Sequence, residues 1–262
     1  MPADDAIFRR SGGRFEPTLL AQGPWSPDHA HGGAVAGLIA HVAGAEPSPV
    51  PMRVARLTLD LLHPVPLRPL SVTTQVQREG RRVQLLHVSL TDGDRQLVHA
   101  SVQRIRVEPG ITSAVAAEAE PTESRPDPSH GIPAERMSEV PGFIRAIDYA
   151  RAPQRSNSSP VLVWLRLRCS LVEGEAVTPL VRAAVAGDFT SGTASGLDWQ
   201  HWRYINPDLS VHLEREPIGE WVAVEASARL SNDGTGQSYS RILDFQGVVG
   251  RGQASMFVER QA

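Results

Sequence analysis

Trp25-Ser26-Pro27-Asp28-His29-Ala30-His31-Gly32-Gly33, with the apolar run that follows it to Gly44, is the stretch that decides the fold. One helical face carries apolar side chains at i, i+3, i+4 and i+7, namely Val35, Leu38, Ile39 and Val42. The other face consists of alanine and glycine, so the helix belongs inside the protein, where small residues let other backbone come close. The amides at a helix start are unpaired and point outward. The stretch therefore predicts a buried central helix whose N-terminus lines a site.

The bulk composition narrows the classes of partner and compartment. The chain has 262 residues and a net charge of −3 without a basic block, which argues against nucleic acid as a partner. The single cysteine, Cys169, excludes an intramolecular disulfide and a cysteine-based zinc site. No apolar run is long enough to span a bilayer, and the charged first residues do not read as a signal peptide. We therefore expect a soluble, cytoplasmic protein with no membrane partner.

Alternating apolar and polar residues predict antiparallel strands after the central helix. In the first part of the chain these patterns cover Val54–Leu62, Leu70–Arg78, Val83–Leu90 and Gln96–Val107. Further strand patterns lie at Gly142–Tyr149 and Val161–Leu171. A proline-rich, partly acidic segment separates the two sets, which predicts an N-terminal domain at 1–108, a linker at 109–136 and a C-terminal domain at 137–262.

The second part of the chain repeats the plan of the first. Thr178-Pro179 predicts an N-cap followed by proline at the first position of a second small, apolar helix. Leu209–Leu213 mirrors Leu57–Leu61 at an offset of 152 residues, and strand patterns follow it to Val258. Two copies of one helix with four or five antiparallel strands are thus expected, and the two sheets can pair with each other.

Four motifs carry a resemblance to a known family: Gly23-Pro24-Trp25 to His31-Gly32-Gly33, Pro207–Leu213, Gly219-Glu220-Trp221, and Gly234-Thr235-Gly236. Together they resemble the acyl-CoA thioesterase II family and its thioesterase-like relatives. The resemblance implies an α+β fold, the tandem or double hot-dog, in which each half is an antiparallel sheet curled around a central helix. It also implies hydrolysis of an acyl-CoA thioester by direct attack of water. No cofactor is then expected beyond the coenzyme A moiety of the substrate itself.

The resemblance also implies a catalytic group in the second half, made of an aspartate, a threonine or serine, and a glutamine. Asp208 matches the aspartate. Alignment places Ala228 and Ala254 at the other two positions, with Ser227 and Gln253 one residue away. Because a shift of one residue moves a side chain to the opposite face of a strand, a bulge or register change would have to bring these two to Asp208. Asp208, Ser227 and Gln253 are the catalytic candidates.

Substrate contacts are expected at Trp25, His31, Gly32 and Gly33, and no set of residues has the spacing of a metal site. The two alanines leave an alternative open, a non-catalytic acyl or acyl-CoA binding protein on the same fold. A structural subunit is a third reading. Exposed sheet edges or faces make a homo-oligomer plausible.

Overall fold

The computed structural model describes residues 6–116, 142–152, 160–194, 196–198 and 200–261. Within these residues, the N-terminal half contains one short 3-10 turn, one long helix and six strands. Their bounds are β1 Ala6–Ser11, β2 Arg14–Pro17, the 3-10 turn Leu19–Ala21, α1 Gly32–Ala45, β3 Met52–Leu61, β4 Ser71–Arg78, β5 Val83–Asp92 and β6 Arg95–Arg106. The expected helix and the four expected strands after it are therefore present.

The C-terminal half follows the same order with two additions at its start. Its elements are α2 Gly142–Arg145, β7 Ile147–Arg151, β8 Val161–Leu167, β9 Ser170–Val172, α3 Pro179–Ala194, β10 Trp202–Ile205, β11 Asp208–Leu213, β12 Val222–Leu230, β13 Thr235–Asp244 and β14 Gly247–Arg260. The prediction of a strand over Gly142–Tyr149 is wrong for its first residues, which form the turn of helix α2. The physical reason is contact with the N-terminal half, since the N–H of Phe143 donates to the carbonyl oxygen of Gln22.

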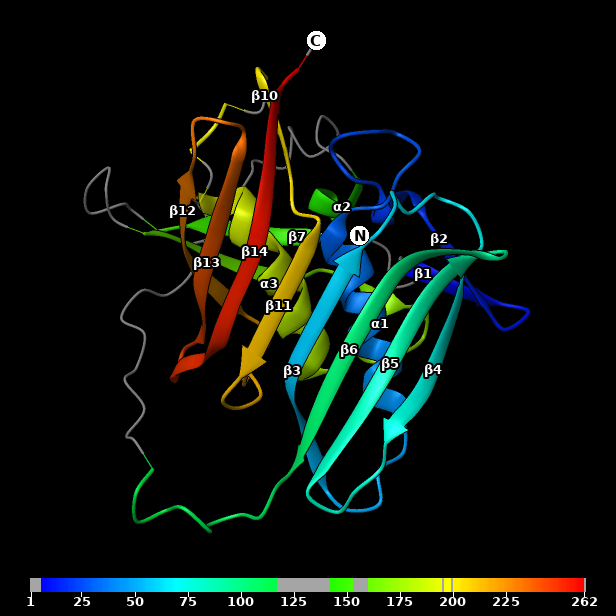
Figure 1. Cartoon of the computed structure of the whole chain (residues 1–262), viewed down its shortest axis with the longest axis vertical. Coiled ribbons are helices and arrows are strands. Elements are labelled where there is room, and N and C mark those ends of the chain that lie inside the picture. Colours follow the sequence, from blue (N-terminus) through cyan, green and yellow to red (C-terminus); the bar gives the residue numbers. More distant parts are fainter. Residues whose placement is uncertain (1–5, 117–141, 153–159, 195, 199, 262) are drawn as a thin grey trace.

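One sheet joins both halves (Figure 1). It has eleven strands in the order β4-β5-β6-β3-β11-β14-β13-β12-β8-β7, with β10 pairing alongside β14. The halves meet where β3 and β11 run antiparallel, and Leu59 pairs there with Leu209. The two sheets thus pair with each other, as expected from the repeat, and the structure adds which strands meet.

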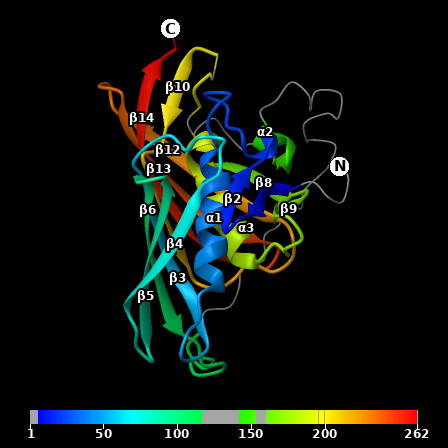
Figure 2. The same cartoon turned by 90° about the vertical axis from the view of Figure 1, so that its right-hand side faces the viewer.

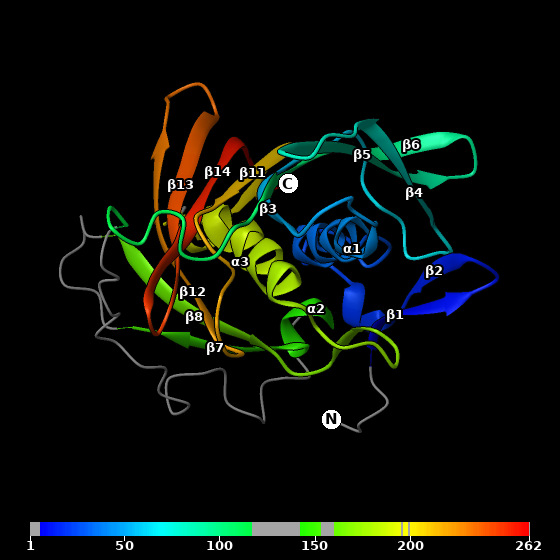
Figure 3. The ribbon, with the colours of Figure 1, turned by 90° about the horizontal axis from the view of Figure 1, so that it is seen from below.

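The two long helices lie side by side against one face of the sheet (Figures 2 and 3). We call this the inner face. Small residues allow α1 to approach its neighbours closely, and a Cβ atom at Gly37 would touch Leu171 and Val185 at 3.0 Å. Thr178 caps α3 as predicted, because its Oγ1 accepts from the N–H of Val181 at 3.3 Å. Helices held in the curve of an antiparallel sheet, once in each half, make the chain a double hot-dog of the α+β class.

Strand alternation separates the inner face from the outer face of the sheet. On β11, Leu209 and Val211 are buried towards the helices, whereas Ser210 and His212 point outward. On β14, Ala254 and Met256 are buried, whereas Gln253, Ser255 and Phe257 are exposed. The inner face is therefore an apolar core, and the outer face is polar.

The remaining pieces lie at the margins of this core. Strands β2, β1 and β9 form a small separate sheet, in which β1 runs parallel to β9. Most of the expected linker at 109–136 falls outside the described residues, so its boundaries stay a prediction. Among the described helices, none combines the length and apolar character needed to cross a membrane.

Candidate functional site

A buried carboxylate stands where the two long helices meet. Asp188 lies in the middle of α3, and its side chain is only 5% exposed. Its Oδ2 lies 3.2 Å from Nδ1 of His31, the residue that precedes α1. A Cβ atom added to Gly32 would fall on Oδ1 of Asp188 well inside 3.0 Å, a separation that real Cβ atoms essentially never show. The carboxylate of the second half therefore rests against the N-terminus of the helix of the first half.

His31 caps α1 with its ring. Its Nδ1 accepts from the N–H of Gly33 at 2.9 Å. The ring is stacked between Phe143 and Phe189, with centroid distances of 4.7 and 5.4 Å. Because Nδ1 has a single lone pair, it cannot accept from Gly33 and donate a proton to Asp188 at the same time.

Asn206 joins the carboxylate to the start of β11. Its Nδ2 donates to Oδ1 of Asp188 at 3.2 Å and to the backbone oxygen of Asp208 at 3.4 Å. The amide thus supports the oxygen of Asp188 that faces Gly32. Trp25 packs edge-on against Tyr204, two residues before Asn206, with 5.1 Å between the ring centroids. It therefore supports the segment that carries Asn206 and does not contact Asp188 in any described interaction. The predicted substrate contacts Trp25 and His31 therefore border Asp188 and the segment that holds it.

Buried hydroxyl pairs fix α3 on the sheet just after Asp188. The Oγ1 of Thr190 lies 2.8 Å from Oγ of Ser240, and Oγ of Ser191 lies 2.7 Å from Oγ of Ser238. The four residues are almost completely buried. Gly252 leaves room for them, because a Cβ there would meet Ser240 and Thr190 below 3.0 Å. These hydrogen bonds hold the end of α3, and with it Asp188, in a fixed position relative to β13.

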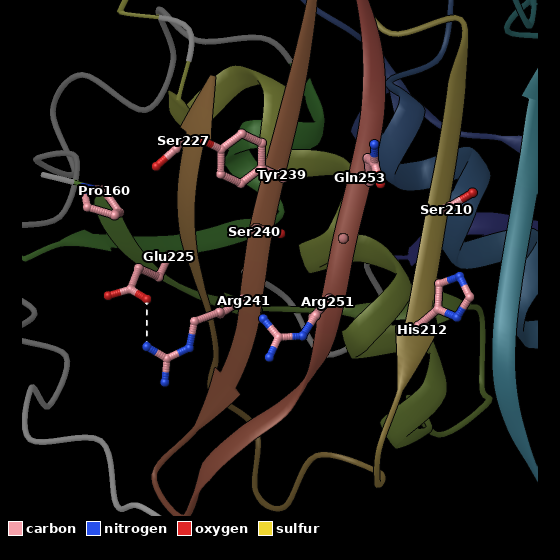
Figure 4. A pocket seen from close by; sticks show the side chains of 11 residues that line it. Pro160, Ser210, His212, Glu225, Ser227, Tyr239, Ser240, Arg241, Arg251 and Gln253 are labelled. Carbon is pink, nitrogen blue, oxygen red and sulfur yellow. Dashed lines mark hydrogen bonds and ion pairs between the residues drawn. The ribbon is translucent and has the colours of Figure 1, made fainter. Parts of the chain in front are cut away.

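The three predicted catalytic residues do not gather in this way. Oδ1 of Asp208 accepts from the backbone N–H of Ser255 at 2.9 Å. Ser227 and Gln253 lie on the outer face, with Tyr239 between them in the strand ladder (Figure 4). Their backbones are therefore two strand spacings apart, about 10 Å. No interaction that the structure describes joins any two of the three, and their joint role stays a prediction.

The register change that would have turned these side chains inward is not in the described ladders. β12 and β13 pair without a shift, and the irregularity between β13 and β14 lies at Ile242 and Leu243, far along the strands from Gln253. Ala228 and Ala254 point inward, and both are register partners of Ser238. A hydroxyl on the neighbouring strand thus stands between the two alanines.

Asp188 and Asn206 were missed by the sequence reasoning. The signal for Asp188 was present in Ala183–Phe189, where a carboxylate interrupts an otherwise apolar, buried helix segment. A charge in such a place is rare unless it is paired or functional. Within the described part of the chain, no three His, Cys, Asp or Glu side chains converge as metal ligands.

Comparisons with known proteins agree with this architecture. Profiles of the acyl-CoA thioesterase N-terminal and C-terminal domains match residues 21–105 and 116–258. No functionally curated sequence matches the chain.

Solved structures add the fold. A candidate thioesterase II from Thermobifida fusca YX is 18% identical, with a TM-score of 0.74 over 98% of this chain and 96% of that one. A hot-dog protein of unknown function from Alicyclobacillus acidocaldarius is 13% identical, with a TM-score of 0.72 over 100% and 98% of the two chains. The acyl-CoA thioesterase II of Mycobacterium marinum is 14% identical, with a TM-score of 0.62 over 93% and 98%. At these identities the neighbours show the shared fold, and the matched domain profiles show the family: the chain belongs to the acyl-CoA thioesterases of the double hot-dog type.

Proposed function

We propose that this protein hydrolyses acyl-CoA thioesters at the junction of α1 and α3, with Asp188 as the general base. One observation carries the proposal: a buried carboxylate of one half lies against the N-terminus of a helix from the other half. A carboxylate can take a proton from water, and helix-start amides can hold the oxygen of a polarised carbonyl. These are the two groups that attack of water on a thioester needs.

The reaction balances with these groups alone. Asp188 takes a proton from water while the water oxygen bonds to the thioester carbon. The carbonyl oxygen gains negative charge and is held by amide N–H groups of the first turn of α1. The bond between carbon and sulfur then breaks, and the proton on Asp188 passes to the thiolate of coenzyme A. Asn206 keeps the carboxylate in place throughout.

The test is release of thiol from a panel of acyl-CoA esters of different chain length. The variant Asp188→Asn keeps the size of the side chain and removes the base, so we expect kcat/KM to fall by about 10² to 10⁴, the range of general base catalysis. Asp198→Asn is the matched control, because Asp198 is an exposed aspartate bonded to His201 and Gln200.

Variants of the earlier candidates separate the two possible sites. We expect Ser227→Ala and Gln253→Ala to stay close to wild type, because both side chains lie on the outer face. Loss of activity in these two variants with an active Asp188→Asn would overturn the assignment. Binding of acyl-CoA by folded wild-type protein without turnover of any chain length would instead identify a binding protein. The cytoplasmic location and a role in lipid metabolism stay predictions from the sequence.

A further inference from the structure

Four basic side chains form a row across the outer face of the sheet. Arg241 of β13 lies opposite Arg251 of β14, Arg251 lies opposite His212 of β11, and His212 lies opposite Arg56 of β3. Directly opposite residues of antiparallel strands point to the same side of the sheet. The row therefore crosses four neighbouring strands and includes the seam between the two halves.

This row is only partly compensated within the described structure. Arg241 donates to Oε2 of Glu225 at 3.0 Å, and Arg56 donates to Oγ of Ser101 at 3.3 Å. Arg251 and His212 are exposed, and no described side chain forms an ion pair or hydrogen bond with either one. The Nε of Arg56 is buried without a described hydrogen-bond partner. Like charges directly opposite one another destabilise a sheet. An anion bound over the row would therefore stabilise it.

A depression of about 600 Å³ opens beside this row (Figure 4). Such a volume falls within the range of small-molecule sites, about 300–1,000 Å³. Its other lining residues are mostly hydroxyl and amide groups from the next positions along the same strands: Ser210, Ser227, Tyr239 and Gln253. Tyr239 is 47% exposed, and among the described residues no other aromatic ring stacks on it.

We propose that this depression binds a nucleotide that carries two or more phosphates. Arginine forks bind phosphate oxygens in pairs, and an exposed aromatic ring offers a surface on which a base can stack. A second copy of the chain is a poor occupant, because two-fold packing of this face would bring two basic rows together. Both a free nucleoside diphosphate and the nucleotide end of coenzyme A carry the required chemistry.

This site is separate from the hydrolytic one. Asp188 lies on α3 against the inner face, whereas the basic row lies on the outer face of the same sheet. The proposal therefore stands whether or not Asp188 is the base.

The test is calorimetry of the full-length protein with three probes: inorganic pyrophosphate, ADP and coenzyme A. We expect Arg251→Ala to weaken binding of pyrophosphate and ADP by about tenfold or more, as loss of a hydrogen bond to a charged group does. Arg78→Ala is the matched control, because Arg78 is an exposed arginine on β4, at the far edge of the sheet. Glu225→Gln should tighten binding, because it frees Arg241 for the ligand.

The role of the ring and the source of the nucleotide follow from the same experiment. We expect ADP to bind more tightly than pyrophosphate, and Tyr239→Ala to abolish that difference. If Arg251→Ala weakens the binding of coenzyme A as much as that of ADP, the site binds the nucleotide end of coenzyme A. If Arg251→Ala weakens the binding of ADP but not that of coenzyme A, the ligand is a free nucleotide. Absence of binding by all three probes, or equal behaviour of Arg251→Ala and Arg78→Ala, would overturn the proposal.

Discussion

Gly32 offers the sharpest test of how Asp188 is placed. It is the first residue of α1 and has an ordinary helical backbone, so alanine meets no strain in φ there. The added methyl group would nevertheless meet Oδ1 of Asp188 well inside 3.0 Å and its Cγ at 3.0 Å. The three atoms nearest to the added methyl group all belong to the carboxyl group of Asp188, so Gly32→Ala acts first on this carboxylate, at the end of the helix where we place the thioester oxygen.

The expected size of the effect follows from that geometry. Restoring ordinary van der Waals contact requires Asp188 to move by about 1 Å, and a displacement of this size can reduce a reaction about 100-fold. We therefore expect kcat/KM to fall about 100-fold, equivalent to about 2.7 kcal/mol of transition-state stabilisation. Thiol release at a series of substrate concentrations measures it, and urea unfolding shows whether the fold is retained.

Gly44→Ala is the control on the same helix. A Cβ atom at Gly44 would lie 3.6 Å from Cδ2 of Leu180, which is ordinary contact. This variant should keep full activity and gain about 0.5–1 kcal/mol of stability, because alanine loses less conformational entropy than glycine in a helix. Equal loss of activity in both variants would show a general effect on the helix.

A double variant decides whether Gly32→Ala acts through the carboxylate. Residues in contact give non-additive effects, whereas independent sites give additive ones. Adding Gly32→Ala to Asp188→Asn should lower kcat/KM little further. A full additional 100-fold loss would refute the reasoning, as would wild-type activity in Gly32→Ala alone.

Two further predictions concern stability. Burial acts to raise the pKa of Asp244, but bonds from Arg215 and from two backbone N–H groups outweigh it and hold the pKa below its ordinary value. The stability that the Asp244 carboxylate contributes is thus fully present above about pH 3.9, and it is lost as the pH falls through the lower pKa of the folded state. Asp244→Asn should therefore lower the free energy of unfolding by about 3–5 kcal/mol at pH 7, measured by urea unfolding, but by little at low pH. Arg104 is 5% exposed, burial lowers its pKa, and it donates to the carbonyl oxygens of Ala43 and Glu46 at the end of α1. Arg104→Met should therefore cost about 3 kcal/mol in the same assay, and a loss below about 1 kcal/mol would show that these carbonyls find other partners.

Much of the architecture could be predicted because it depends on local patterns. Apart from His41, the run from Gly32 to Gly44 is apolar or small on every side, which requires burial. Strand alternation marks β3 to β6 and β11 to β14. The small sheet was beyond such reasoning. Ala6 pairs with Ser170, and no periodicity in a six-residue strand indicates a partner so distant in sequence.

The site was harder to predict, because it depends on contacts between the two halves. Alternation along β12 and β14 shows that Ser227 and Gln253 share the polar face, but it does not show which groups stand opposite Asp208. The carboxylate of Asp188 stands out in an apolar segment of the sequence, but its contact with Gly32 arises only when α3 packs beside α1. Sequence patterns predict that each helix is buried, but they do not predict which residue of one helix contacts the end of the other.

The internal repeat allows the two ends of the helix pair to be compared, and only one of them carries the groups that we propose for hydrolysis. Asp188 is the tenth residue of α3, and His41 is the tenth residue of α1. His41 is buried in the corresponding place, near the start of α3, where its Nε2 lies 3.1 Å from Oε2 of Glu175. The two positions are therefore counterparts under the approximate symmetry of the halves.

The counterparts differ in the chemistry that the reaction needs. Burial is the main cause that lowers the pKa of His41, and Glu175 opposes it only in part. α3 begins with Pro179, which has no N–H to offer an oxyanion, whereas α1 begins with two glycines. Pro179→Gly would restore a backbone N–H at the start of α3, but the side chain at the position that corresponds to Asp188 would still be the imidazole of His41. If only this end of the helix pair carries both groups, Asp188→Asn should lower kcat/KM by about 10² to 10⁴ although His41 is left intact.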